Sequence, residues 1–378
     1  MRVGFGTTVL ARARSGGGVD GIGSYTWELG KALQTQGNVQ IVPVGFGACC
    51  GEETFPGTAA SVELQSYVRH ALMAAFSPLA WPGEKALLPH VDLFHATDHL
   101  VPRLPHIPVV ATLMDAIPLS HPQWIRTSLA KQKAWLWRRS GRWADHVITI
   151  SEYSRKEIVK YFGIDAERIT SIPLGVHERF FDPIDAGFCD ELVKRLALPE
   201  QFFLFVGTLQ PRKNLERALD AHGSLPEALQ RNVPLVIVGR EGWSSEGVVA
   251  RMNDPHAGRN VRWLRHLPDI EMRALMQSAT ALVFPSLCEG FGLPVVEAFA
   301  SGLPVITSNT TSLPEVAGDA ALLVDPESAG DIAQAMYDVA RDDALASRLR
   351  QAGVQRARRF TWQACAEETL TVYERIVR

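Results

Sequence analysis

The sequence is poor in cysteine and has no long apolar run. Its cysteines form no C-x-x-C pair and no zinc-like spacing with histidines, which argues against a zinc site or a redox dithiol. We expect reduced, buried thiols in a reducing cytoplasm, with a reactive pair at the adjacent Cys49 and Cys50 as the alternative. No apolar stretch approaches the roughly 18 residues of a membrane-spanning helix. The strand-like start, Met1–Phe5, predicts that no signal peptide is present.

Neither sign of charge dominates the composition. Lys and Arg number 38 and Asp and Glu 41, so the net charge is −3, which gives no general attraction to nucleic acid. The sequence has no repeat of solenoid length and no low-complexity tract. At 378 residues, with 46% hydrophobic and 21% charged residues, it suits an ordinary globular protein of two domains.

Short apolar runs alternate with helical patterns, which predicts an α/β fold with parallel sheets. The strands predicted in the first half are Val3–Phe5, Gln40–Val44, Asp92–His95, Val109–Leu113, Val147–Ile150 and Ile169–Ile172. Those predicted in the second half are Phe202–Val206, Leu235–Val238, Val261–Leu264, Ala281–Phe284, Val305–Ile306 and Leu322–Val324. Two such series predict two Rossmann-like, doubly wound domains facing a central cleft. We place the linker in the irregular segment up to about Phe188, with domains at 1–182 and 183–361.

A glycine-rich corner between residues 287 and 297 carries two carboxylates, Glu289 and Glu297. A short buried strand precedes it, and Pro294 suits the first position of a helix that Gly302 ends. The start of such a helix presents free backbone N–H groups and a partial positive charge. Helical side chains lean toward the N-terminus, so Glu297 can face the same space as these amides. The corner therefore offers amides and carboxylates to a hydroxyl-rich, anionic ligand such as a sugar nucleotide.

Two cations, Arg212 and Lys213, stand between the strand 202–206 and the next helix. A helix N-terminus repels cations, so their position indicates a bound anion. A diphosphate fits, because Arg can grip phosphate with two hydrogen bonds and Lys adds a compact charge. The alternative is a pair of solvated surface cations.

Residues 16–21 formally satisfy the dinucleotide pattern G-x-G-x-x-G, but the context is wrong. The match begins about ten residues after the first strand, and no acidic residue follows the second strand to hold a ribose. We favour a loop that enters the helix starting at Gly21, where small residues such as Gly23 let the backbone approach donor and acceptor. A purely structural glycine loop is the alternative.

The corner resembles the E-x7-E motif of retaining glycosyltransferases, and E-G-F-G-L-P-x-x-E is similar to family 4 of that group. Further similar blocks follow in the family's order, so the resemblance covers nearly the whole chain. They are Gly21–Tyr25, Pro173–Val176, Gly207–Asn214 and Leu235–Gly239. The resemblance implies a GT-B fold, with an acceptor-binding first domain, a donor-binding second domain and a terminal helix (362–378) that returns to the first.

The resemblance also implies roles in donor binding. Glu289, with Arg212 and Lys213, is the expected catalytic group, because it contacts the sugar hydroxyls while the cations hold the diphosphate. Glu297 is expected to hold the ribose. Further donor contacts are expected from Gly290, Phe291, Gly292, Leu293, Gly239, Arg240, His266 and Leu267. Thr208 stands where many relatives have an additional Arg, so the clamp depends on Arg212 and Lys213.

In the first domain, the predicted acceptor side of the cleft is less regular. Gly21 and Gly23 belong to it, and Asp115 ends a segment that in the family commonly reads His-Asp. Here Met114 occupies the histidine position, and a methionine cannot donate a hydrogen bond to a sugar. His95 and Asp98, from the adjacent loop, are the expected replacements, with His99 beside them. For Asp115, capping of the next loop is the alternative role.

Residues 124–143 are basic and aromatic and contain no acidic residue. Such a segment can rest on an anionic membrane, which would suit a lipid-linked acceptor. Because Trp135 and Trp137 cannot share one helical face, core packing with a solvated basic face is the alternative. We expect weak, salt-sensitive liposome binding. The long insertion at 49–89, in which we expect a helical stretch near Val62–Ala75, either shapes acceptor choice or is a surface excursion.

The expected reaction is transfer of a hexosyl group from a nucleotide diphosphate sugar to a hydroxyl of a glycan or lipid-linked acceptor, with retention. The chain has no Asp-x-Asp motif, so we expect no metal and no cofactor beyond the donor. GDP-mannose is the preferred donor, because blocks 207–214 and 95–98 resemble bacterial mannosyltransferases of polysaccharide and O-antigen assembly. The alternatives are a UDP-sugar donor, a GT-B-like epimerase or phosphorylase, and a non-catalytic nucleotide-sugar sensor. The expected location is the cytoplasm, with peripheral contact at the inner membrane face.

Overall fold

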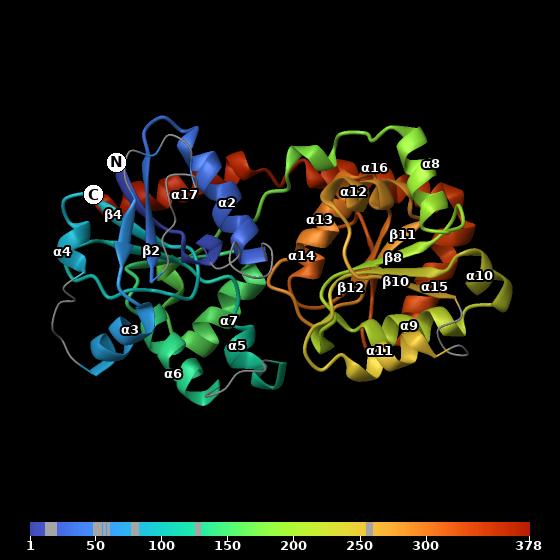
Figure 1. Cartoon of the computed structure of the whole chain (residues 1–378), viewed down its shortest axis with the longest axis horizontal. Coiled ribbons are helices and arrows are strands. Elements are labelled where there is room, and N and C mark those ends of the chain that lie inside the picture. Colours follow the sequence, from blue (N-terminus) through green and yellow to red (C-terminus); the bar gives the residue numbers. More distant parts are fainter. Residues whose placement is uncertain are drawn as a thin grey trace. The chain divides into compact units, whose positions relative to one another are not determined.

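The computed structural model describes residues 1–11, 21–47, 55, 58, 61–76, 83–124, 130–254 and 260–378. The chain forms two compact units (Figure 1). Unit 1 comprises Met1–Gly175 and Thr361–Arg378, and unit 2 comprises Val176–Phe360. The predictions for Cys49, Cys50 and the glycines at 16–18 fall outside the described residues. Of the other cysteines, Cys288 and Cys365 are buried and Cys189 is half-buried.

Unit 1 is built on a parallel sheet of order β3-β2-β1-β4-β5-β6-β7. Its strands are β1 (Arg2–Gly6), β2 (Gln40–Phe46), β3 (Val62–Leu64), β4 (Leu93–Ala96), β5 (Val109–Thr112), β6 (His146–Thr149) and β7 (Ile169–Ser171). Val3 of β1 pairs with Ile41 on one side and Leu93 on the other. The inner strands β1, β2, β4, β5 and β6 are buried along nearly their whole length, as their continuous apolar runs predict, whereas the edge strands β3 and β7 are partly exposed.

The strand β3 was not predicted, because the sequence pattern indicated a helix from about Val62 to Ala75. The structure places only Tyr67–Phe76 in a helix, α3, and pairs Val62 with Val44 at the sheet edge. Three residues are too few for the alternation of a strand to be recognised.

Helices cover both faces of this sheet (Figure 1). They are α2 (Gly21–Gln34), α3 (Tyr67–Phe76), α4 (Glu84–Leu87), α5 (Ile117–Ser120), α6 (Ala130–Gly141), α7 (Glu152–Phe162) and α17 (Trp362–Val377), with 3-10 turns η1 (Pro122–Trp124) and η2 (Ala166–Arg168). The terminal helix α17 packs against α2 and β6, which confirms that it returns to the first unit. Gly175 allows this approach, because a Cβ there would lie 2.3 Å from the Trp362 nitrogen.

Unit 2 has a parallel sheet of order β10-β9-β8-β11-β12-β13. Its strands are β8 (Phe203–Val206), β9 (Leu235–Val238), β10 (Val261–Leu264), β11 (Ala281–Phe284), β12 (Val305–Ser308) and β13 (Leu322–Val324). Its helices are α8 (Ala186–Arg195), α9 (Leu215–Ser224), α10 (Glu227–Asn232), α11 (Glu246–Asn253), α12 (Asp269–Ser278), α13 (Leu293–Ala300), α14 (Leu313–Ala317), α15 (Ala329–Arg341) and α16 (Asp343–Ala357), with 3-10 turns η3 (Glu178–Phe180) and η4 (Pro211–Lys213). The α/β class and the two doubly wound sheets are therefore as predicted.

The boundary between the units lies earlier than the predicted position after residue 182. The segment expected to be a linker is ordered within unit 2, because η3 contacts α13 and α8 packs against α12. The Ile184 N–H also donates to the Gln277 side chain at 2.9 Å. These contacts assign residues 176–188 to the second core.

Candidate active site

In unit 2 the predicted catalytic residues gather where the strand order reverses. Strands β9 and β10 lie on one side of β8, whereas β11, β12 and β13 lie on the other. Ligands of doubly wound sheets bind at such a point, outside the carboxyl ends of the strands. The cations at 212–213 follow β8 and the corner with Glu289 follows β11, so both belong to this edge.

The cations lie on a short turn that is fixed by its neighbours. Arg212 and Lys213 form η4 with Pro211, and Asn214 ends the turn in a left-handed conformation (φ 60°). The Asn214 side-chain amide donates to the carbonyl oxygens of Pro285 (2.9 Å) and Pro326 (2.7 Å). It thereby ties the cation turn to the loops after β11 and β13.

Glu289 is held by both cations. Lys213 Nζ lies 2.6 Å from Oε1 and Arg212 Nη1 lies 2.8 Å from Oε2 of the carboxylate. The same Arg212 nitrogen donates to the Cys288 carbonyl at 3.2 Å, and the Leu287 N–H donates to the Arg212 carbonyl at 2.8 Å. The two predicted halves of the site are therefore joined by charge-assisted bonds across 76 and 77 residues of sequence.

This cluster has a strong local field. Burial raises the pKa of Glu289, but the charges of Lys213 and Arg212 lower it by more, to about 2. Burial also lowers the pKa of Lys213, which Glu289 partly counteracts. Lys213 Nζ is 4.7 Å from the centre of the Phe284 ring, a further contact for a desolvated cation. One buried carboxylate thus faces two cations, which leaves a net positive charge for an anion.

The glycine corner has the backbone that the sequence predicts. Gly292 has φ +106°, which disfavours a side chain, and α13 begins at Leu293 with Pro294 in its first turn. The Ser312 hydroxyl lies 2.9 Å from the Glu289 carbonyl oxygen and 3.1 Å from that of Phe291. Phe291 is buried and packs edge-on against Phe360. The ring therefore anchors the corner, and Phe291 can contribute only its backbone to a ligand.

Glu297, in the second turn of α13, is partly buried and forms no ion pair with another described residue. Burial raises its pKa to about 7, although the charge of Arg179 opposes the shift and that of Asp269 adds to it. Arg179 and Asp269 form an ion pair with each other at 3.1 Å. No pattern in the sequence indicated that η3 and α12 lie near this carboxylate.

The other predicted donor contacts lie at the same sheet edge. Gly239 after β9 is required by packing, because a Cβ there would lie 1.9 Å from the Gly207 carbonyl oxygen. The Trp263 indole donates to the Gly239 carbonyl at 2.9 Å. The predicted contacts Thr208, Arg240 and His266 are exposed, whereas Gly290 is buried and Leu267 is half-buried. All of them follow β8, β9, β10 or β11, so the structure brings them together at one edge.

In unit 1, the prediction for His95 is wrong. Its side chain is fully buried, and both ring nitrogens are engaged, Nδ1 with Tyr373 OH (2.5 Å) and Nε2 with Thr112 Oγ1 (2.7 Å). The Tyr25 hydroxyl bonds the same Thr112 oxygen at 2.7 Å. Burial lowers the pKa of His95 to about 3, so it is a neutral core residue that joins β4, β5 and α17. It has no free atom for an acceptor.

The remaining predicted acceptor residues lie at the carboxyl edge of the first sheet. Asp98 follows β4, and its Oδ1 accepts the Leu100 N–H at 2.8 Å. Asp115 follows β5, and its Oδ1 accepts the Ile117 N–H at 2.9 Å, the capping role that was the alternative. Gly21 is exposed at the start of α2 and Gly23, two residues later, is buried.

Met114, at the position where the family commonly has histidine, is buried and does not offer a polar contact. Sequence reasoning also missed Asn214 and Ser312. For Asn214 the sequence did carry a signal: an asparagine, which tolerates the left-handed conformation, stands between the Pro-Arg-Lys run and the next helix.

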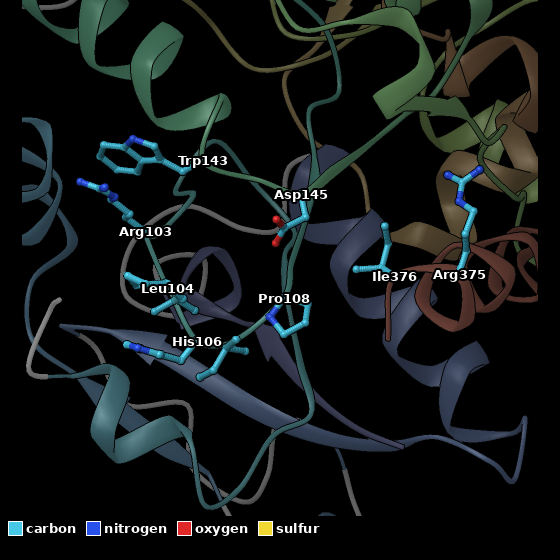
Figure 2. Close-up of a pocket in the computed structure, with 10 residues that line it drawn as sticks. Arg103, Leu104, His106, Pro108, Trp143, Asp145, Arg375 and Ile376 are labelled. Carbon is cyan, nitrogen blue, oxygen red and sulfur yellow. The ribbon is translucent and has the colours of Figure 1, made fainter. Parts of the chain in front are cut away.

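A cavity of about 580 Å³ lies elsewhere, at the opposite edge of the first sheet (Figure 2). Pro108 and Asp145, which line it, directly precede β5 and β6 and so mark the amino ends of those strands. Arg103 and Trp143 line another part of its wall, and Arg375 of α17 a third. Its position at the amino ends separates it from the residues predicted to bind a ligand.

Within the described residues, no group of three or more His, Cys, Asp and Glu side chains could hold a metal ion. The helices in that part of the chain also include none that is both long and apolar enough to cross a bilayer.

Both halves of the chain match the models of known protein families. Residues 191–356 match the family model described as glycosyl transferases group 1, and residues 19–180 match that of glycosyltransferase family 4. The chain is 32% identical over 299 residues to the glycogen synthase of Mycobacterium tuberculosis, which covers 75% of this chain and 68% of that protein. It is 30% identical over 229 residues to the O-antigen chain mannosyltransferase B of Escherichia coli. That match spans 60% of each protein.

Solved structures share the fold. Sucrose-phosphate synthase from Thermosynechococcus elongatus aligns with a TM-score of 0.77 at 19% identity, over 99% of this chain and 98% of that one. Anabaena Alr3699/HepE, in complex with UDP and glucose, aligns with a TM-score of 0.74 at 17% identity, over 99% of both chains. The fold of the chain is the GT-B fold, as the sequence resemblance implied.

Proposed function

Because the chain belongs to glycosyltransferase family 4, we propose that it transfers a mannosyl group from GDP-mannose to a hydroxyl of a glycan or lipid-linked acceptor. The similarity to an O-antigen chain mannosyltransferase of Escherichia coli supports mannose as the transferred sugar and a role in the assembly of a bacterial surface polysaccharide. Unit 2 would bind the donor and unit 1 the acceptor, in the cytoplasm and with no metal.

The observation that carries this proposal is the cluster of Glu289, Arg212 and Lys213 at the switch point of the second sheet. The negatively charged oxygen atoms of a donor diphosphate could accept hydrogen bonds from both cations, in competition with Glu289. In transfer, Arg212 and Lys213 would neutralise the negative charge that develops on the departing diphosphate. Glu289, released from part of its ion pairing, would accept hydrogen bonds from the sugar hydroxyls.

The corner would complete donor binding. The backbone amides of residues 290–293 precede or open α13, where a helix N-terminus favours oxygen atoms with negative charge. Glu297 would accept hydrogen bonds from the ribose. The loop at His266 and Leu267, after β10, would contact the base.

We propose that transfer retains the anomeric configuration. A retaining glycosidase would need a carboxylate nucleophile about 5 Å from a second carboxyl group. The sequence offers no secure nucleophile on the other face of the sugar, so we favour a same-face substitution in which the leaving phosphate deprotonates the acceptor. Positioning and electrostatic stabilisation would then supply most of the acceleration.

A UDP-sugar is the second candidate donor. The structurally similar HepE is described in complex with UDP and glucose, and its fold matches over nearly the whole chain. GDP-mannose and UDP-glucose are therefore compared directly, first by the shift in thermal unfolding that each nucleotide sugar produces, since a bound ligand stabilises the folded state.

The activity itself is tested by incubating the enzyme with each donor and a mannosylated acceptor, then following nucleotide release and the anomeric signal by NMR. We expect GDP release that depends on acceptor and an α-linked product. A product with inverted anomeric configuration would refute retention, and release of UDP instead of GDP would show that the donor is a UDP-sugar. Donor turnover without acceptor, or only in the presence of phosphate, would instead indicate an epimerase or a phosphorylase.

A further inference from the structure

One side of α3 in unit 1 exposes large apolar side chains. They recur at helical spacing, so they share one side of the helix, and they are 45% to 79% exposed. The members are Val68, Leu72, Met73 and Phe76. The residues on the other side of α3 are buried. A gathering of this kind marks an interaction site, whereas singly exposed apolar residues do not.

The apolar side of α3 continues onto α6. Trp135 of α6 stacks on Phe76, with ring centroids 5.6 Å apart and planes inclined by 24°. Trp135 is itself exposed, and the Arg139 guanidinium lies 5.9 Å from the centre of its ring. Trp137, two residues later, is half-buried and packs near His99 instead. Only one of the two tryptophans therefore belongs to this surface.

A cavity of about 460 Å³ opens beside Trp135 and is lined by arginines. Its lining residues are Arg103, Trp135, Arg138, Arg139, Arg142 and Trp143. Within the described part of the chain, Arg138 and Arg139 form no ion pair with a carboxylate. The sequence has no Asp or Glu at residues 64–83 or 116–144. Several guanidinium groups around one cavity repel one another unless an anion lies between them.

We propose that unit 1 docks on a bilayer containing anionic phospholipids through this membrane face, which consists of the exposed side of α3, Trp135 and the arginine-lined cavity. Apolar side chains of a surface helix enter the boundary between head groups and acyl chains. Arginines bind phosphate oxygens through paired N–H donors, so the cavity fits lipid phosphate groups. A second copy of the chain is a poor occupant, because two faces of this positive charge repel each other.

The membrane face differs from the segment that the sequence indicated. Residues 124–143 supply most of its charge, with Arg103 adding to it, but its exposed aliphatic side chains and Phe76 come from α3, which lies in the insertion at 49–89. Docking through the membrane face does not require any particular sugar donor. Vesicle binding and sugar transfer can therefore succeed or fail separately.

The test is co-sedimentation of the full chain with vesicles of phosphatidylcholine alone or with about 30 mol% phosphatidylglycerol. We expect binding only to the anionic vesicles, and weaker binding at about 0.5 M salt, because charge attraction is screened. Replacing Arg138 and Arg139 by Glu should weaken binding more than about tenfold, since each basic residue near the surface contributes roughly 1 kcal/mol. Phe76→Ser should weaken it about fivefold or more through lost apolar burial.

Matched variants in unit 2 serve as controls. Arg348→Glu with Arg350→Glu changes two exposed arginines of α16, and Tyr337→Ser removes an exposed aromatic side chain from α15. These variants should bind vesicles as the unchanged chain does, and thermal unfolding should show that all variants fold. Equal binding to neutral and anionic vesicles, no binding at all, or equal losses in the control variants would overturn the proposal. Self-association that Phe76→Ser abolishes in the absence of lipid would also overturn it, in favour of a protein interface.

Discussion

At the scale of single residues, the charge on Glu289 connects the two halves of the donor site. Glu289→Gln removes one negative charge between two cations, and a neutral amide holds neither in place as firmly. We expect transfer to fall by about 10²–10³. The control is Glu200→Gln, an exposed glutamate of the same unit. Near-normal turnover of a folded Glu289→Gln enzyme would contradict the assigned role.

Glu297 provides a test by pH. Its pKa in the folded state, about 7, lies above the ordinary value of 4.5, so the folded protein binds the extra proton. Folding stability therefore falls as pH rises through the window from 4.5 to 7. Glu297→Gln should be more stable than the unchanged chain by about 1–3 kcal/mol at pH 8, and by little at pH 4.5. Urea unfolding at both pH values measures this, and an equal difference at both would show that the shift in pKa is absent.

The candidate site was predictable where a residue's chemistry and its place in the sequence agree. Arg212, Lys213 and Glu289 each lie just after an apolar strand, and the structure joins them. His95 occupies a similar place but faces the core, because the strand continues through residue 96 and Thr112 and Tyr373 bond its ring. The sequence alone cannot show whether a polar side chain near the end of a strand finds its hydrogen-bond partners in the core or faces the edge of the sheet. The partners of Glu297 were also hidden, because Arg179 and Asp269 come from distant elements.

At the scale of elements, a close approach of two loops in unit 2 makes Gly239 sensitive to substitution. A Cβ on Gly239 would collide with the Gly207 backbone, and backbone atoms cannot move aside without separating β8 from β9. Gly239→Ala should therefore destabilise the chain by more than about 2 kcal/mol. Chemical denaturation measures the loss.

Gly223 is the matched control for this substitution. It lies inside α9, and an added Cβ there would meet no atom within 4 Å. Gly223→Ala should be neutral or stabilise by up to about 1 kcal/mol, as alanine favours a helix. Equal losses in both variants would show that the collision at Gly239 is relieved by a shift of the loop.

The sheets were predictable because their strands are short, continuous apolar runs separated by polar helical segments. All the strands expected from the sequence form, including Phe203–Val206 and Ala281–Phe284 beside the candidate site. The edge strand β3 was missed, since three residues carry too little pattern. Element ends and the start of unit 2 depended on packing partners that only the folded chain provides.

At the scale of the whole molecule, the buried bond between His95 and Tyr373 couples distant parts of the sequence. Tyr373→Phe deletes the hydroxyl and leaves a buried ring nitrogen of His95 without its partner. We expect unit 1 to lose about 1–3 kcal/mol of stability, whereas unit 2 should be unaffected. Hydrogen exchange of the two units reports each separately. Tyr337→Phe, on the surface of unit 2, is the control, and increased exchange in both units would argue against a local effect.

Unit 2 is one uninterrupted stretch of chain, whereas unit 1 is completed by a helix located after it in the sequence. During synthesis from the N-terminus, the surface of unit 1 that packs against α17 therefore stays uncovered until the whole of unit 2 has been made. The half produced first is completed last, and a chaperone that shelters apolar surface would be needed most during that delay.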